Sequence, residues 1–179
     1  MMVLLTGSPG IGKTTVLMKV IQFLKTRRNV KVGGMITREV REDRVRVGFQ
    51  IIDLATGETG WLAHVKQDKG PVIGKYRVNL RDLENVGVKA LMKAFKDSDL
   101  IVCDEIGPME MCSSLFREAV RKMSTVNKPV LGTIHYRFSE SLVDELKEAE
   151  NLKVFKITYT NRDFMPYVIF RELSKFFKG

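Results

Sequence analysis

A glycine-rich string near the start of the chain has the residue types that bind phosphate groups. It matches the pattern G-x-x-x-x-G-K-[ST] and, with one further threonine, consists of Gly7, Ser8, Pro9, Gly10, Ile11, Gly12, Lys13, Thr14 and Thr15. Glycine at the fixed positions permits a tight turn in which successive backbone N–H groups point at phosphate oxygens. Lys13 adds a positive charge for the β- and γ-phosphates, and the Thr14 hydroxyl can bind Mg²⁺. The string therefore predicts a site for a nucleoside triphosphate and Mg²⁺, with Lys13 as a candidate catalytic residue.

Two consecutive acidic residues follow an apolar run in the second half of the chain. Residues 100–103 read Leu-Ile-Val-Cys and lead into Asp104 and Glu105. A carboxylate at the end of a buried parallel strand lies in the crevice beside a phosphate loop, so we expect Asp104 to bind Mg²⁺. Glu105 is then placed to orient or deprotonate a water molecule opposite the γ-phosphate. Consecutive acids favour hydrolysis over transfer to an organic acceptor.

Four further polar residues have two interpretations each. Arg38 follows an expected strand and can neutralise charge on the γ-phosphate as a catalytic residue, or it is one of several exposed arginines. Asn161 and Arg162 follow the last expected strand, where they can bind the nucleotide, Arg162 by stacking on its base. The alternative for this pair is a helix cap and a surface arginine. His135 either senses the γ-phosphate or is a neutral histidine bonded to the backbone.

The hydrophobic pattern predicts the elements that must hold these residues in place. Buried strands are expected at residues 2–6, 30–36, 100–103, 129–134 and 154–157. Helices are expected at residues 13–28, 81–96, after 113 or 114, at 139–150 and at 161–177. Such alternation of strands and helices is typical of an α/β protein with a parallel sheet covered by helices.

One stretch interrupts this alternation. Residues 44–54 alternate apolar with polar side chains, residues 55–58 read as a turn, and residues 59–63 read as the return strand of a hairpin. We therefore expect a single domain over residues 1–179, with a central, mostly parallel sheet and a β-hairpin insertion at about residues 38–80.

Composition narrows the class of protein further. The chain has 179 residues and a formal net charge of +9, with ordinary apolar and charged fractions of 44% and 28%. No apolar run approaches the roughly 20 residues that cross a bilayer, and no secretory signal pattern is present. Two cysteines supply neither a disulfide framework nor a four-ligand zinc site. We expect a monomeric cytoplasmic protein without a membrane partner; nucleic acid is a possible partner, disfavoured because no basic stripe carries interleaved aromatic residues.

Several strings outside the glycine-rich loop resemble one known family, the thermophile-type nucleoside-triphosphatases, which includes cancer-related nucleoside-triphosphatase. The strings are GGMITREVR at 33–41, GF at 48–49, GKY at 74–76, DEIGPME at 104–110 and TNRD at 160–163. The resemblance covers nearly the whole chain. It implies a three-layer P-loop fold with strand order 5-1-4-3-2, and Mg²⁺-dependent hydrolysis of ATP, GTP and other nucleoside triphosphates to the diphosphate and phosphate. It gives no role to His135.

Two other functions stay open at this point. A small kinase would pass the γ-phosphoryl group to an acceptor held by the insertion at residues 38–80. A nucleotide-gated protein that binds RNA or DNA would use hydrolysis as a switch, and polynucleotide would then accelerate hydrolysis.

Overall fold

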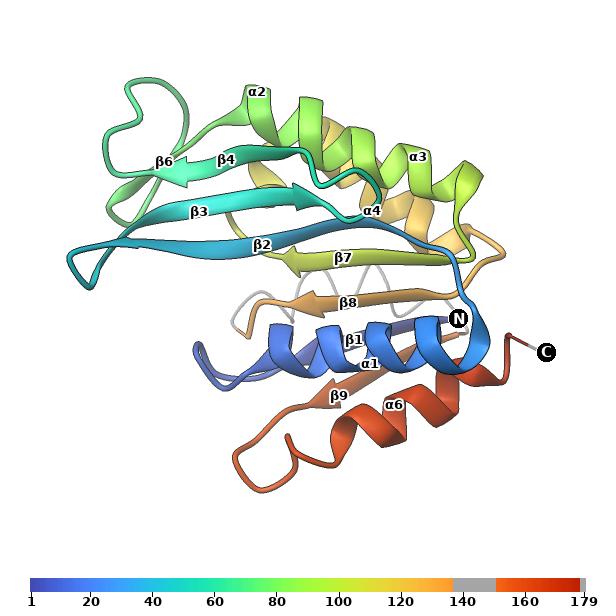
Figure 1. Cartoon of the computed structure of the whole chain (residues 1–179). Coiled ribbons are helices and arrows are strands. Elements are labelled where there is room, and N and C mark those ends of the chain that lie inside the picture. Colours follow the sequence, from blue (N-terminus) through green and yellow to red (C-terminus); the bar gives the residue numbers. More distant parts are fainter. Residues whose placement is uncertain (137–150, 178–179) are drawn as a thin grey trace.

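The computed structural model describes residues 1–136 and 151–177. These residues form one nine-stranded sheet and the helices that pack on it (Figure 1). The strands are β1 (Met2–Thr6), β2 (Val32–Glu42), β3 (Val45–Asp53), β4 (Thr59–His64), β5 (Val72–Ile73), β6 (Tyr76–Val78), β7 (Leu100–Ile106), β8 (Val130–Ile134) and β9 (Leu152–Lys156). Their order across the sheet is β5-β6-β4-β3-β2-β7-β8-β1-β9. The neighbouring strands β2, β7, β8, β1 and β9 are parallel to one another. When these five strands are numbered 1 to 5 along the chain, their order from β9 to β2 is 5-1-4-3-2, as the resemblance implied.

The insertion is larger than the expected hairpin. β2 has 11 residues, and it runs past β7 to pair with β3 in antiparallel register from Met35 to Glu42. β4, β6 and β5 continue the same sheet, again antiparallel. The sheet is therefore mixed rather than mostly parallel. The sequence pattern missed β5 and β6 because strands of two and three residues are too short to show a period.

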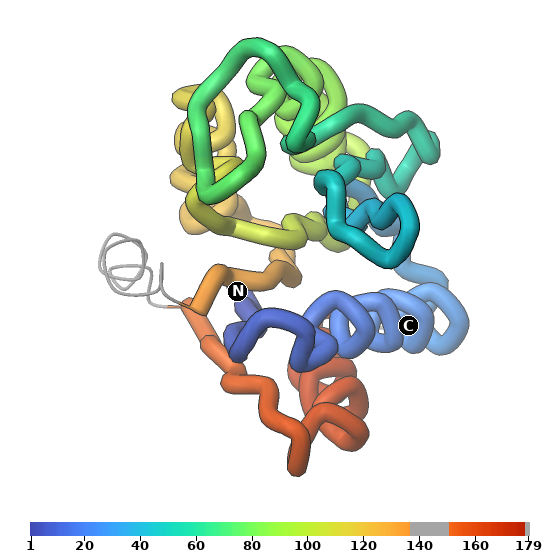
Figure 2. Tube along the Cα trace, turned by 90° about the vertical axis from the view of Figure 1, so that its left-hand side faces the viewer, coloured from blue at the N-terminus to red at the C-terminus, as the bar shows by residue number. Residues whose placement is uncertain are grey.

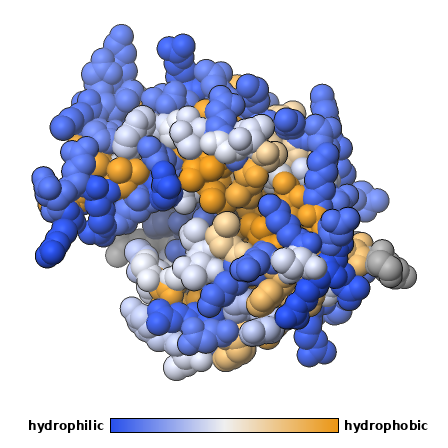
Figure 3. Space-filling model, viewed as in Figure 1, coloured by the Kyte–Doolittle hydropathy of each residue, from blue (hydrophilic) through white to orange (hydrophobic). Residues whose placement is uncertain are grey.

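Helices cover both faces of the sheet, which makes three layers. α1 (Lys13–Arg28) and α6 (Met165–Ser174) lie on one face, and α2 (Leu80–Asp82), α3 (Lys89–Asp97) and α4 (Ser114–Thr125) lie on the other (Figure 1). Side chains alternate along a strand, so Val3 and Leu5 pack in the core on the α1 side while Met2 and Leu4 pack in the core beneath α3 and α4. Helices cover only one face of the insertion: above α1, apolar side chains over β2 and β3 remain visible (Figure 3).

Within the described residues, the predicted helices are present with two differences. The expected helix at 81–96 is one continuous helical segment, in which a π-helical turn (Leu83–Val88) joins α2 to α3. The last helix begins at Met165 rather than residue 161, because residues 158–164 form turns, and Pro166 lies in its first turn. The helix expected at 139–150 lies outside the described residues. Within the described ranges, no helix is both long and apolar enough to span a bilayer.

The parallel strands all end at one edge of the sheet, the edge that faces the viewer in Figure 2. The connections that leave β1 and β7 start there, and the turn between β2 and β3 lies beside them. This edge is where open α/β sheets bind their ligands.

Candidate functional site

The glycine-rich loop joins the end of β1 to the start of α1. Gly12 caps α1 with a left-handed φ of 104°, a conformation that favours glycine. Gly7 packs closely against Ile157, the residue that follows β9, because a Cβ at position 7 would lie 2.6 Å from the Ile157 carbonyl oxygen. The Lys13 ammonium donates a hydrogen bond to the Gly7 carbonyl at 3.2 Å, which holds its charge across the loop. The loop thus combines a helix N-terminus with a fixed cation, as a phosphate site requires.

Asp104 connects this loop to the middle of the sheet. Its carboxylate is 1% exposed and accepts hydrogen bonds from the hydroxyl groups of Thr14, at 2.8 Å, and Thr133. Burial raises the pKa of Asp104, while these two hydrogen bonds and Lys13 act in the opposite direction. The structure therefore brings together Thr14 and Asp104, the two residues that the sequence assigned to a metal.

Glu105 follows Asp104 across a cis peptide bond and lines the same space. Its Oε1 atom is buried and has no hydrogen-bond partner within residues 1–136 and 151–177. Burial raises the pKa of Glu105; Lys13 lowers it and Asp104 raises it further. A buried carboxylate oxygen without a protein partner is suited to accept a hydrogen bond from a bound molecule.

A cavity of about 600 Å³ opens in front of these groups. The phosphate loop and the first turn of α1, including Lys13 and Thr14, form one wall. The insertion forms the other wall with residues from β2 to β6, and Glu105 lies between the two. The cavity is large enough for a drug-sized ligand.

The remaining candidates from the sequence lie in three different places. His135 lines the cavity, and its backbone N–H donates to the Ile106 carbonyl at 3.0 Å. Arg38 is exposed and donates to the Gln50 side chain at 2.8 Å. Because side chains alternate along β2, Arg38 lies on the face opposite Thr37, which lines the cavity, so the structure does not bring Arg38 to the site.

Asn161 and Arg162 lie outside the lining of the cavity, in the loop that follows β9. The Asn161 side chain accepts from the Thr158 N–H and donates to the Lys156 carbonyl, both at 2.8 Å, so it shapes this loop. The Arg162 guanidinium lies 5.3 Å from the centre of the Tyr159 ring, and Tyr159 is 74% exposed. The loop starts beside the phosphate loop, because the Ile157 N–H donates to Thr6 at 2.7 Å.

Sequence reasoning missed several groups that the structure places here. Thr133 is fully buried in β8, a strand whose other residues are apolar or glycine. A polar side chain within such a strand is a sequence signal that could have identified it. Glu110 is buried, lines the cavity, and has its pKa raised to about 8 by burial, against hydrogen bonds from its own and the Gly107 backbone N–H. Tyr159 carried no signal, being a lone aromatic residue in a loop.

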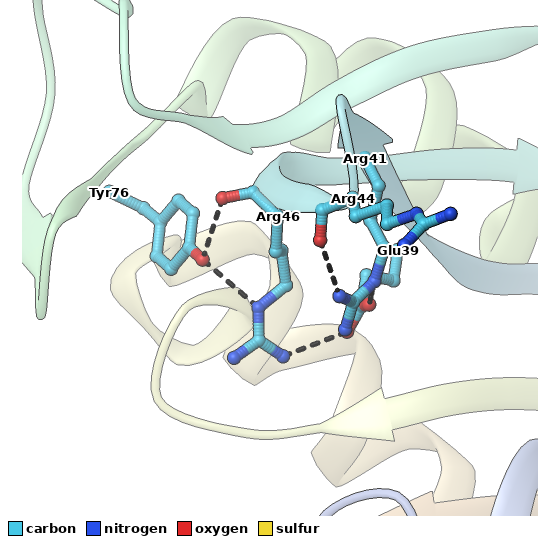
Figure 4. Close-up of polar contacts among 5 residues, drawn as sticks. All are labelled: Glu39, Arg41, Arg44, Arg46 and Tyr76. Atoms are coloured by element: carbon cyan, nitrogen blue, oxygen red, sulfur yellow. Dashed lines mark hydrogen bonds and ion pairs between the residues drawn. The ribbon is translucent and has the colours of Figure 1, made fainter.

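A polar network from the insertion was also missed, because its members are distant in sequence. Arg46 donates from Nε to the Tyr76 hydroxyl at 3.0 Å and from Nη1 to Glu39 at 2.8 Å (Figure 4). Burial alone would raise the pKa of Glu39, but hydrogen bonds from Arg41 and Arg46 lower it overall. All three members of the network line the cavity.

The parallel order of the sheet, the loop at the end of β1 and the acidic pair at the end of β7 define a nucleotide-binding P-loop protein. Residues 2–170 match the family model described as NTPase. The chain is 48% identical over 172 residues to nucleoside-triphosphatase THEP1 of Thermofilum pendens, covering 96% of this chain and 94% of that protein. The chain therefore belongs to the THEP1 family of nucleoside-triphosphatases.

Two solved structures share the fold. The crystal structure of THEP1 from Aquifex aeolicus superposes with a TM-score of 0.84 at 30% identity, over 97% of this chain and 99% of that one. The solution structure of a human cancer-related nucleoside triphosphatase gives a TM-score of 0.77 at 33% identity, over 96% and 97% of the two chains. The chain is accordingly a nucleoside-triphosphatase, and the resemblance seen in the sequence is confirmed.

Proposed function

We propose that this nucleoside-triphosphatase depends on Mg²⁺, acts as one domain, and cleaves the γ-phosphate of ATP, GTP and other nucleoside triphosphates with little regard for the base. The observation that carries the proposal is the placement of Glu105, whose buried Oε1, without a hydrogen-bond partner in the part of the chain that the structure describes, lines the same cavity as Lys13 and Thr14. A general base in that place acts on a water molecule at the γ-phosphate end of the loop.

The oxygen atoms at the loop suit Mg²⁺ held jointly with a triphosphate. Thr14 Oγ1 and Asp104 Oδ2 lie 2.8 Å apart, and both are hard oxygen donors. Within the described residues, no cluster of three or more His, Cys, Asp or Glu forms an all-protein cage. Mg²⁺ in phosphoryl-transfer sites uses one or two protein oxygens together with phosphate oxygens, so Thr14 and Asp104 would hold the ion. When bound, the ion supplies charge neutralisation at the β- and γ-phosphates.

The chain's own residues account for the other steps of hydrolysis. The backbone N–H groups of residues 7–15 bind the phosphates, and Lys13 stabilises the charge on the γ-phosphate. Glu105 takes a proton from water as the water oxygen bonds to the γ-phosphorus and the bond to the β–γ bridging oxygen breaks. Thr133 acts through Asp104 by fixing the orientation of its carboxylate. Arg38 has no part in this mechanism because it lies on the opposite face of β2.

We propose further that the base stacks on Tyr159 and Arg162. This pair projects from the loop that starts beside Gly7, and Asn161 holds that loop in shape. Aromatic and guanidinium planes recognise the face of a base rather than its edge, so all four common bases are accepted.

Initial rates of phosphate release from ATP, GTP, CTP and UTP, with Mg²⁺ and with a chelator, test the proposal. We expect release from all four within about tenfold of one another, since stacking discriminates weakly between bases, and none with the chelator. Release from a single nucleotide, or release that survives removal of the divalent ion, would show the proposal to be wrong.

A further inference from the structure

The cavity extends well beyond the space that a triphosphate needs at the loop. Its far part, here called the distal pocket, is formed by Glu39, Arg46, Phe49, Leu62, Tyr76 and Glu110. Except for Glu110, these residues come from the insertion, which the sheet order places on the side of β7 away from β1 and β9. The loop after β9, where we place the base, lies at the other end of the parallel sheet.

The direction in which a triphosphate lies determines which of its groups faces the distal pocket. Thr14 and Asp104 mark the position of the β- and γ-phosphates, and Glu105 follows Asp104 at the end of β7. β2 is the next strand beyond β7. The γ-phosphate therefore faces the insertion, and the distal pocket opens at the end of the triphosphate where the phosphoryl group is transferred.

The walls of the distal pocket favour a flat molecule. The rings of Phe49 and Tyr76 meet edge to face, with centroids 5.3 Å apart and an interplanar angle of 69°. The Arg46 guanidinium lies 5.4 Å from the centre of the Phe49 ring, and Leu62 forms a buried aliphatic part of the wall. Aromatic and aliphatic side chains around one compact space are typical of sites for small ring compounds.

The charges in the distal pocket disfavour a second phosphate group. Arg46 is the one Lys or Arg among the lining residues of β2–β6 and 105–110, and its guanidinium already donates to Glu39, at 2.8 Å, and to the Tyr76 hydroxyl, at 3.0 Å. Glu105 and Glu110 add two further carboxyl groups. A phosphorylated ligand would meet the Glu105 carboxylate and a guanidinium whose Nε and Nη1 donors already have partners, whereas an uncharged hydroxyl compound would find hydrogen-bond acceptors.

We propose that the distal pocket binds an uncharged ring compound carrying a hydroxyl group, and that this hydroxyl takes the γ-phosphoryl group in place of water. In this step the acceptor oxygen bonds to the γ-phosphorus, the bond to the β–γ bridging oxygen breaks, and its electrons leave with the nucleoside diphosphate. The hydroxyl proton passes to the Glu105 carboxylate, so the products are a phosphate monoester and the diphosphate. The inference rests on the proposed function, because it uses the same loop and the same base.

Phosphorus NMR of the wild-type protein with Mg²⁺ and ATP tests the inference. Uridine, adenosine and pyridoxine serve as uncharged probes, and uridine monophosphate serves as the charged comparison. We expect a monoester signal with at least one uncharged probe, together with a matching loss of free phosphate, and none with uridine monophosphate. Hydrolysis without any probe is measured in parallel. Hydrolysis without monoester from any probe overturns this inference alone, while absence of both reactions also overturns the proposed function.

Variants of Phe49 show whether the monoester depends on the distal pocket. Phe49→Ala should slow monoester formation at low probe concentration by roughly 10- to 100-fold, the loss expected when one aromatic platform is removed. Phe49→Leu keeps an apolar side chain of similar volume and should show the same loss if Phe49→Ala folds poorly. Both variants should keep the rate of hydrolysis without probe. Phe164→Ala, a matched change of an exposed aromatic residue at the start of α6, should change neither reaction.

The competing arrangement, in which the nucleotide base occupies the distal pocket, gives a different result. Phe49→Leu would then weaken binding of a non-hydrolysable ATP analogue but not of inorganic triphosphate, which has no base. That outcome overturns the inference. The inference is supported if wild-type protein and Phe49→Leu bind each of the two ligands with equal affinity. It is also supported if the Phe49 variants lose monoester formation and Phe164→Ala keeps it.

Discussion

Replacing Glu105 with glutamine should separate nucleotide binding from hydrolysis. Glutamine has nearly the same shape and keeps an oxygen at Oε1, but it cannot accept a proton from water. A positioned general base contributes about 10²- to 10⁴-fold to a rate, which is about 3–5 kcal/mol of transition-state free energy. We therefore expect kcat for phosphate release to fall by that factor, while binding of a non-hydrolysable analogue stays the same or tightens because a negative charge beside the γ-phosphate is lost.

The pH profile gives a second measurement of the same prediction. Burial raises the pKa of Glu105, with Lys13 opposing and Asp104 adding to the effect. Since only the ionised carboxylate acts as the base, the wild-type rate should rise with pH through this raised pKa, and Glu105→Gln should lose that rise. Glu118→Gln, an exposed position on α4, is the control and should leave both rate and profile unchanged. A Glu105→Gln variant that releases phosphate at the wild-type rate would refute the assignment of Glu105 as the base.

Three further predictions concern the residues that support the site. Thr133→Val removes a hydroxyl that donates to the buried Asp104 carboxylate, so urea denaturation should show a loss of about 1–3 kcal/mol in the free energy of unfolding; an unchanged midpoint would contradict this. Gly34→Ala places a Cβ 2.0 Å from the Val102 carbonyl oxygen at a φ of 113°, so it should cost at least about 3 kcal/mol by the same measurement. Glu110 binds its proton more tightly in the folded state, where burial raises its pKa from 4.5 to about 8, so its contribution to stability is full below about pH 4.5 and disappears as pH rises to about 8. Over that range this contribution should lower the free energy of unfolding by up to about 5 kcal/mol, and Glu110→Gln should remove this part of the pH dependence; an unaltered slope in that variant would count against a buried Glu110.

The centre of the site could be predicted because its chemistry is local in sequence. The loop at residues 7–15 is one continuous string, and Asp104 and Glu105 directly follow a buried strand. Parallel strands end at the same edge of a sheet, so these segments had to meet once the strand order was known. The contact between Thr14 and Asp104 follows from that rule.

The wall formed by the insertion could not be predicted in the same way. Glu39, Arg46 and Tyr76 form one network across three strands, and neither spacing nor composition links them. Arg38 illustrates the related difficulty of alternation: it was expected to follow a strand, but β2 continues past it to Glu42, and the pleat directs it away from the cavity while Thr37 and Glu39 line it. One residue of register decides which side chains reach the ligand.

The central claim is that the loop at residues 7–15 and Asp104 together hold a triphosphate with Mg²⁺. Calorimetric titration of the wild-type protein and of Lys13→Ala with a non-hydrolysable ATP analogue tests it most directly, in the presence and absence of Mg²⁺. We predict binding by the wild-type protein that Mg²⁺ strengthens, and binding by Lys13→Ala that is weaker by at least about 100-fold, as expected when one fixed charge on a phosphate is lost. Equal affinity of the two proteins, or wild-type affinity that is the same with and without Mg²⁺, would contradict the claim.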